Sequence, residues 1–354
     1  MAVLLVTPAF WPEVRRGAER FAHDLARALG GSIVTTHPGP PRRAVEDGVP
    51  VRLVPRLPGE RRARRRAYEE YLTAIAPLAL ALRRSGAQAA IATHPTAAVA
   101  AQRAGLPTVF AYMGIPHRQA LANRRARVAL VQRACRDGLA VTALSQAAAD
   151  GFERWLGIEA QVIRPGVDLD AFAPGGERDP RPTIVCPSAA AEPRKRVGLL
   201  VEAFALVRAR RPDARLVLDR GAAALAPLPD GVALSDLDDR AALADAYRRA
   251  WVCALPSWGE AFGLVLAEAL ACGTPVVGAD REGIPEVIGD DPRVGRLFAG
   301  EDPRGLATAL LEAIELAGDP PTAAACRARA GRFGLDRCAA AYAKLLHDRA
   351  GIRP

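Results

Sequence analysis

Two glutamates stand in the stretch "PSWGEAFGLVLAEALACGTPVVG" at residues 256–278, Glu260 before an apolar run and Glu268 inside it. Gly273 and Pro275 would end that run, so a helix is expected over 262–271. A helix mouth with a glycine in its first turn offers free N–H groups and a partial positive charge, which suits phosphate. Carboxylates are repelled by phosphate but accept hydrogen bonds from hydroxyl groups, so the pattern fits a sugar nucleotide. From these residues alone, an acid that favours the helix dipole plus a solvated helical glutamate remains the competing interpretation.

The rest of the chain alternates between strand and helix patterns that would position such a site. This alternation predicts an α/β fold with parallel sheets and with ligand sites at the carboxyl ends of strands. The Pro- and Gly-rich segment 163–182 has no period and predicts a hinge. We therefore expect two Rossmann-like, doubly wound domains facing across a cleft, at 1–165 and 166–334, with a helix in 335–354 that packs back towards the first. The strands and helices expected in the first domain include 3–8, 18–29, 31–37, 49–56, 60–84 and 137–145, with Ser145 capping the next helix.

The charge of the chain is concentrated in its first half. Residues 1–165 hold 24 arginines, no lysine and 12 acidic residues, a net charge of +12, whereas the whole chain of 354 residues has +9. A basic half favours an anionic partner such as a membrane surface, a nucleic acid or a phosphorylated acceptor. The alternative is an arginine-rich composition that produces solvated helix faces.

The expected compartment is the cytoplasm. The six cysteines lack C-x-x-C spacing and are expected to be reduced core thiols. The first residues lack the basic region of a signal peptide, and no run of 18 uncharged apolar residues predicts a spanning helix.

Several segments closely resemble the retaining GT-B glycosyltransferases, a nucleotide-sugar family marked by Glu-x7-Glu (family 4-like, group 1). The most specific match is "GEAFGLVLAEALACGTPVVG" followed by "GIPEVI". The other matching segments are "RRGAERFAHDLARAL", "VIRPGVDLDAF" and "EPRKRVGLLVEAFALVRARRPDARLVL".

This resemblance implies specific roles for the residues of the motif. Glu260 would contact the transferred sugar, Glu268 the ribose hydroxyls and Lys195 the diphosphate, and Glu260 and Lys195 would be the catalytic residues. Lys195 is one of only two lysines beside 46 arginines, so a lysine at this position is informative. The resemblance implies no metal and no cofactor other than the donor itself. The implied donor-binding residues are Gly17, Arg194, Lys195, Glu260, Phe262, Gly263, Leu264 and Glu268.

Three positions depart from the family pattern. Ala189 stands where relatives usually carry an arginine, and Arg194 or Arg196 could supply the missing charge. Met113 stands where a cleft histidine usually follows the strand. His94 and His117 are the candidates for that acceptor-side role, and both are equally compatible with being plain loop histidines. Pro165 replaces the asparagine of the family's interdomain segment.

The expected activity is the transfer of a hexose from a nucleotide diphosphate sugar to an acceptor hydroxyl with retention of configuration, in cell-envelope glycolipid or polysaccharide synthesis. The alternatives are a GT-B epimerase and a non-catalytic, basic binder of nucleotide sugars or nucleic acid. Only 5% of residues are aromatic, which argues against a nucleic-acid surface.

The stretch 60–84 raises the question of a membrane. It begins with five arginines in six positions (61–66) and continues with an apolar stripe that could pack on the sheet or enter a lipid interface. A lipid or lipid-linked acceptor and peripheral binding at the inner face of an anionic membrane are therefore expected alternatives to a soluble acceptor.

Overall fold

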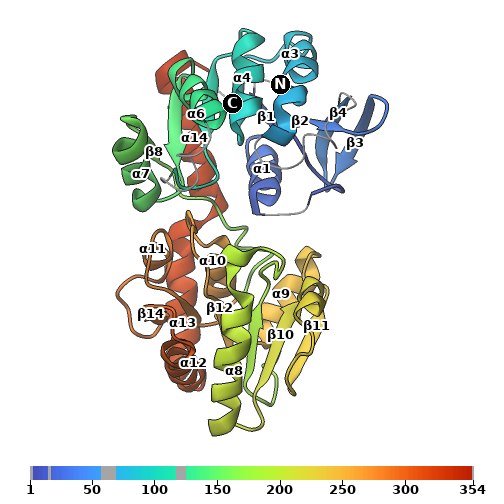
Figure 1. Ribbon diagram of the computed structural model, residues 1–354. Coiled ribbons are helices and arrows are strands. Elements are labelled where there is room, and N and C mark those ends of the chain that lie inside the picture. Colours follow the sequence, from blue (N-terminus) through green and yellow to red (C-terminus); the bar gives the residue numbers. More distant parts are fainter. Residues whose placement is uncertain (1–2, 15–16, 57–68, 117–124, 353–354) are drawn as a thin grey trace. The chain divides into compact units, whose positions relative to one another are not determined.

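The computed structural model describes residues 3–14, 17–56, 69–116 and 125–352 (Figure 1). These residues form two compact units. Unit 1 comprises residues 1–166 together with 335–354, and unit 2 comprises residues 167–334. No helix among the described residues is long and apolar enough to cross a membrane.

Unit 1 is built on an eight-stranded sheet in the order β3-β4-β2-β1-β5-β6-β7-β8. All neighbouring strands run parallel except β3 and β4, which form an antiparallel hairpin at one edge. Strands buried on both faces explain the near-continuous apolar runs of the sequence. The strands are β1 (Val3–Val6), β2 (Ser32–His37), β3 (Arg42–Glu46), β4 (Val49–Pro55), β5 (Ala89–Ala92), β6 (Thr108–Ala111), β7 (Ala140–Ala143) and β8 (Gln161–Val162).

Helices cover both faces of this sheet. On one face α4 packs between α3 and α6 and these helices cover the strands, and on the other face α1 packs against α14. Alternate residues of β1 supply the two cores: Leu4 and Val6 face the first, Val3 and Leu5 the second. The helices are α1 (Gly17–Ala28), the 3₁₀ helix η1 (Glu69–Ala74), α3 (Ile75–Arg83), α4 (Pro95–Arg103), α6 (Arg125–Arg136), α7 (Gln146–Leu156) and α14 (Leu335–Ala350).

Unit 2 has a six-stranded, wholly parallel sheet in the order β11-β10-β9-β12-β13-β14. The order reverses between β9 and β12, and a ligand site is expected at the carboxyl ends of the strands on either side of such a switch point. The strands are β9 (Thr183–Cys186), β10 (Arg215–Asp219), β11 (Val232–Ser235), β12 (Val252–Leu255), β13 (Val276–Ala279) and β14 (Gly295–Phe298).

The helices of unit 2 again form two layers. The long helices α8 and α12 pack against each other, and α10 packs against α9 and α13. The helices are the 3₁₀ helix η2 (Pro193–Lys195), α8 (Val197–Arg210), η3 (Arg220–Leu225), α9 (Arg240–Arg249), α10 (Leu264–Ala271), α11 (Ile284–Ile288), α12 (Pro303–Ala317), α13 (Pro320–Ala330) and η4 (Gly331–Phe333).

The sequence left open whether the apolar stripe of 60–84 packs on the sheet or enters lipid. Most of its described residues pack on the sheet. Ile75, Leu78 and Leu82 are buried in the core beneath α3, with Tyr71 packed against them. Leu72 of the same stripe is 45% exposed, so the stripe is buried only in part. The arginines at 61–66 lie outside the described residues.

The expected state of the cysteines is confirmed. All six are unpaired and buried. Burial raises the pKa of Cys135, Cys272, Cys326 and Cys338 to about 12, which keeps these thiols protonated and poorly nucleophilic at neutral pH.

Candidate active site

The N-terminus of α10 is formed by a glycine that no other residue could replace without strain. Gly263 caps the helix with φ 104°, and no side chain caps the first turn. The helix therefore begins at Leu264, and the expected start at residue 262 is wrong by two positions because Gly263 has a left-handed backbone. The Phe262 ring is buried edge-on against Phe333, so any contact of Phe262 with a ligand would come from its backbone.

Lys195 and Glu260 meet because they follow neighbouring strands. The loop after β9 carries Lys195 and the loop after β12 carries Glu260, and these two strands pair in parallel. The N–H of Trp258 donates to the carbonyl of Arg194 over 2.7 Å, which ties the two loops together. Lys195 Nζ lies 2.6 Å from Glu260 Oε2, and each side chain is about one-sixth exposed, at 16% and 17%. The partial burial strengthens the attraction between the two charges.

The arginines beside this ion pair point in different directions. Arg194 Nη1 lies 3.6 Å from Glu260 Oε2, and its Nη2 pairs with Glu192 at 2.8 Å. Arg196 instead stacks on the Trp258 ring, with Cζ 4.8 Å from the ring centroid. Of the two arginines expected to replace the charge missing at Ala189, Arg194 is the one that reaches Glu260.

Glu268 is not a solvated helical residue. It is 3% exposed, and the Tyr247 hydroxyl on α9 donates to its Oε2 over 3.1 Å. A buried carboxylate is costly unless hydrogen bonds satisfy it, and the Tyr247 hydroxyl supplies one such bond. Sequence reasoning missed Tyr247, since nothing in "DRAALADAYRRA" distinguishes a tyrosine that supports an acid from one that fills a core.

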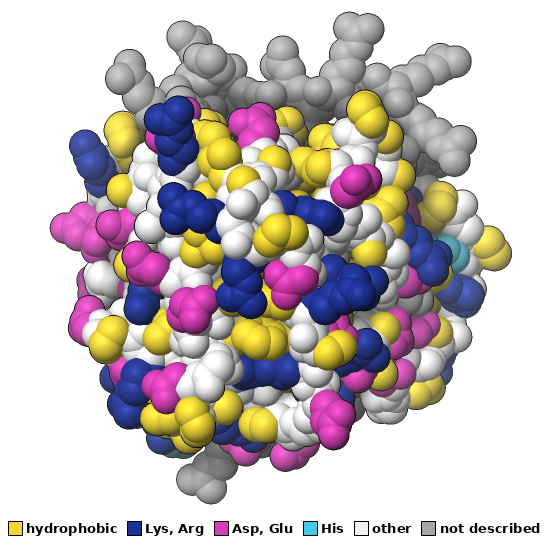
Figure 2. All heavy atoms as spheres, turned by 90° about the horizontal axis from the view of Figure 1, so that it is seen from below, with side chains coloured by type: hydrophobic (Ala, Val, Ile, Leu, Met, Phe, Trp, Pro, Cys, Tyr) yellow, Lys and Arg dark blue, Asp and Glu magenta, His cyan; other side chains and the backbone are white. Residues whose placement is uncertain are grey.

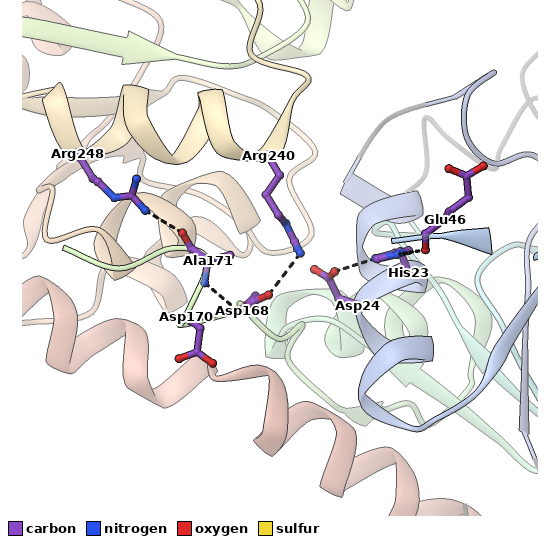
Figure 3. Close-up of polar contacts among 8 residues, drawn as sticks. All are labelled: His23, Asp24, Glu46, Asp168, Asp170, Ala171, Arg240 and Arg248. Carbon is purple, nitrogen blue, oxygen red and sulfur yellow. Dashed lines mark hydrogen bonds and ion pairs between the residues drawn. The ribbon is translucent and has the colours of Figure 1, made fainter. Parts of the chain in front are cut away.

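The segment "RPGVD" is held by its aspartate. Asp168 Oδ1 accepts the backbone N–H groups of Asp170 and Ala171, each over 3.1 Å, and its Oδ2 lies 3.4 Å from Arg240 Nη1 (Figure 3). Arg240 and Arg248 both belong to α9, and Arg248 donates to the Ala171 carbonyl over 3.1 Å. These contacts fix the first turn of unit 2 onto α9.

The described unit 1 candidates Gly17, His94 and Met113 lie on the connections that follow the neighbouring strands β1, β5 and β6. Gly17 begins α1, and a Cβ added there would meet no atom within 4 Å, so space does not demand a glycine. Met113 is partly buried against the core. His117 lies outside the described residues.

His94 caps α4 and carries no charge at neutral pH. Its Nδ1 accepts the N–H of Thr96 over 3.3 Å, and burial, assisted by the charge of Arg127, lowers its pKa to about 3. With Nδ1 acting as an acceptor, the neutral ring carries its proton on Nε2. His94 is thus a hydrogen-bond donor and a poor general base.

Two family descriptions match the chain, one in each unit. "Glycosyl transferases group 1" matches residues 181–315, which include Lys195, Glu260 and Glu268, and "Glycosyltransferase Family 4" matches residues 15–171. The chain belongs to the group 1, family 4 glycosyltransferases. The family expected from the motifs is thereby confirmed, and the match favours a transferase over an epimerase or a non-catalytic binder.

Curated relatives agree with this family, and solved structures agree with its fold. The D-inositol 3-phosphate glycosyltransferase 2 of Catenulispora acidiphila is 34% identical over 228 residues, which cover 54% of this chain and 52% of that protein. The chain thus spans about half the length of the curated relatives it matches. The sucrose-phosphate synthase of Thermosynechococcus elongatus superposes with a TM-score of 0.80 over 98% of this chain and 99% of that one, at 19% identity. The Anabaena protein HepE in complex with UDP-glucose gives 0.74 over 98% and 100%, at 18%. These neighbours confirm the GT-B fold class.

Proposed function

We propose that this family member transfers a hexosyl group from a nucleotide diphosphate sugar to an acceptor hydroxyl, with retention of anomeric configuration. The observation that carries the proposal is the Lys195–Glu260 pair beside the uncapped N-terminus of α10, with the buried Glu268 inside the same helix. The Lys195 ammonium and the free N–H groups at the N-terminus of α10 suit a diphosphate, and the carboxylates of Glu260 and Glu268 suit hydroxyl groups.

Each of the three residues has a role in the proposed reaction. Lys195 stabilises the negative charge that develops on the leaving diphosphate. Glu260 accepts a hydrogen bond from the transferred sugar and holds Lys195 in place before the donor arrives. Glu268, supported by Tyr247, accepts hydrogen bonds from the ribose hydroxyls. The leaving phosphate takes the acceptor's proton on the same face of the sugar, so no carboxylate nucleophile is assigned.

The proposal requires no metal ion. Among the residues that the structure describes, no group of three or more His, Cys, Asp or Glu side chains could hold one. We assign the neutralisation of the diphosphate to Lys195, to the α10 mouth and to Arg194.

The acceptor is proposed to carry a phosphate. Three observations support this: the +12 charge of residues 1–165, the buried Arg127 beside the neutral His94, and relatives named for D-inositol 3-phosphate. A water-soluble polyol phosphate and a phosphate-bearing lipid share this chemistry, so both belong in the assay.

Peripheral membrane contact is proposed to be electrostatic, at the inner face of an anionic membrane in the cytoplasm. Because Ile75, Leu78 and Leu82 are buried, we expect such contact to depend mainly on the arginines at 61, 62, 64, 65 and 66. Figure 2 shows basic and acidic side chains interspersed on the face that it draws, without a patch of one sign. Vesicles containing anionic lipid should sediment the protein at low salt and release it at high salt. Binding that survives replacement of the five arginines by serine would contradict the proposal.

The central experiment is a screen of UDP-, GDP- and ADP-glucose by thermal shift, followed by a transfer assay with inositol phosphate and with phosphatidylinositol. A sugar nucleotide should raise the Tm through binding, and the product should keep the donor's anomeric configuration by NMR. Inversion would exclude the retaining mechanism. Absence of both binding and transfer with every donor would exclude the proposed activity.

A further inference from the structure

The short loop after β13, residues 280–283, contacts the segment that presents Glu260. Glu282 of this loop has φ 58°, a left-handed conformation that residues with a Cβ rarely adopt. Such conformations persist only where the surroundings enforce them, and they cluster at functional sites. The contacts of the Glu282 side chain show what enforces this one.

Glu282 and Gly283 hold the backbone on both sides of Glu260. The N–H of Glu260 donates to Glu282 Oε2 over 2.8 Å, and the N–H of Gly283 donates to the Glu260 carbonyl over 3.1 Å. The two segments touch so closely that a Cβ on Gly283 would lie 2.4 Å from the Ala261 carbonyl oxygen. A side chain at residue 283 would therefore force the segments apart.

The neighbouring residue adds a second attachment. Arg281 lies over the Trp258 ring, with Cζ 5.6 Å from its centroid, and Trp258 is itself hydrogen bonded to the Lys195 loop through Arg194. Three consecutive residues of the loop after β13 thus contact the segment 258–261 (the Glu260 segment). The Lys195 loop, the Glu260 segment and the loop after β13 form one connected set.

We propose that Glu282 is a positioning residue for Glu260. Its carboxylate accepts a charge-assisted hydrogen bond from the Glu260 amide, which fixes the peptide orientation and with it the direction in which the Glu260 side chain leaves the backbone. That direction places Glu260 Oε2 against Lys195 and, on the proposed function, against the transferred sugar. The inference rests on that function and names a residue that neither the motif nor the family match assigns.

The test separates the side chain's hydrogen bond from the strain of its backbone. Glu282→Gly removes the carboxylate but accepts the left-handed backbone without strain, so the relief of strain should offset the stability lost with the hydrogen bond and the variant should still fold. We nevertheless expect kcat for release of nucleoside diphosphate from the preferred sugar nucleotide to fall at least about tenfold. The affinity for the free nucleoside diphosphate, which lacks the sugar, should stay unchanged. Glu282→Gln keeps a hydrogen-bond acceptor and should restore most of the rate.

Asp47 offers a matched control. It also has a left-handed backbone, φ 43°, in the β3–β4 hairpin of unit 1, where it is exposed. Asp47→Gly should relieve strain in the same way and leave kcat unchanged. A wild-type rate for Glu282→Gly, or equal losses in the Gln and Gly variants, would overturn the positioning role. A wild-type protein that releases no diphosphate from UDP-, GDP- or ADP-glucose would instead overturn the proposed function, and this inference with it.

Discussion

Lys195 and Glu260 form a partly buried ion pair at the proposed donor site. Their charges neutralise each other across 2.6 Å. A bound diphosphate would share the Lys195 ammonium and leave Glu260 free to accept a sugar hydroxyl. On the proposed function, this ion pair would hold both side chains in place before the donor binds and so lower the entropy lost on binding.

Lys195→Ala should lower kcat by about a hundredfold, the usual effect of removing one group that stabilises developing charge. Donor affinity should fall as well, since Glu260 would then face the diphosphate unpaired. Initial rates with the preferred sugar nucleotide measure both effects. The control is Lys344→Ala, which removes the chain's other lysine, an exposed residue on α14 paired with Asp348. Equal rates for Lys195→Ala and Lys344→Ala would show that Lys195 has no part in the reaction.

Glu268 accepts a hydrogen bond from the Tyr247 hydroxyl. We expect a variant at Glu268 to change donor affinity and a variant at Tyr247 to change stability. Glu268→Gln should weaken donor binding by about tenfold or more, because hydrogen bonds to a charged acceptor are the stronger ones. Tyr247→Phe leaves the buried carboxylate without one donor and should cost about 1–3 kcal/mol of stability. Titration calorimetry and urea unfolding measure the two quantities. Unchanged donor affinity in Glu268→Gln would argue that this acid serves the fold alone.

At the scale of the helix and strand, the order of elements follows from the sequence, while their ends depend on backbone detail. Ser145 caps α7 as expected, with its hydroxyl accepting the Ala148 N–H over 3.1 Å. The β3–β4 hairpin was missed although Asp47-Gly48 is a turn signal, because β3 is short, polar and at a sheet edge. The contact between Glu282 and the Glu260 amide could not be predicted, since it joins segments 22 residues apart through a side chain on an unusual backbone.

The histidine that caps α4, His94, should make the stability of the protein depend on pH. The unfolded chain protonates His94 near pH 6.5, whereas the folded chain does so only near pH 3. Between these two pH values the unfolded state binds more protons than the folded state. The contribution of the neutral His94 to the free energy of unfolding is therefore complete above pH 6.5 and is lost as the pH falls towards 3. The slope contributed by this one group approaches about 1.4 kcal/mol per pH unit.

His94→Asn keeps a good N-cap and removes the titration, so it should flatten the dependence of unfolding free energy on pH between 6.5 and 3. Urea unfolding at several pH values measures this slope. The comparison variant is His347→Asn on α14, where the histidine is exposed. Identical curves for His94→Asn and the wild type would show that other groups dominate acid unfolding.

At the scale of the whole molecule, unit 1 needs the end of the chain. Tyr342 of α14 is fully buried, meets the Phe21 ring edge-on, and its hydroxyl lies 2.9 Å from Thr142 Oγ1 on β7. Removing residues 335–354 should therefore expose the core face under α1. We expect hydrogen exchange to accelerate in β1 and α1 of the truncated chain while β9, β12 and α10 stay protected. Faster exchange confined to unit 2 would contradict this assignment.

The two ends of unit 2 lie side by side, since the N–H of Val167 donates to the Phe333 carbonyl over 2.7 Å and Val167 forms a bridge with Gly334. Residues 167–334 are thus inserted into unit 1 like a guest domain whose two ends meet at one place. Every residue that we assign to the diphosphate and the sugar belongs to this insertion. A single genetic exchange with two junctions could therefore replace all of these proposed donor-binding residues at once.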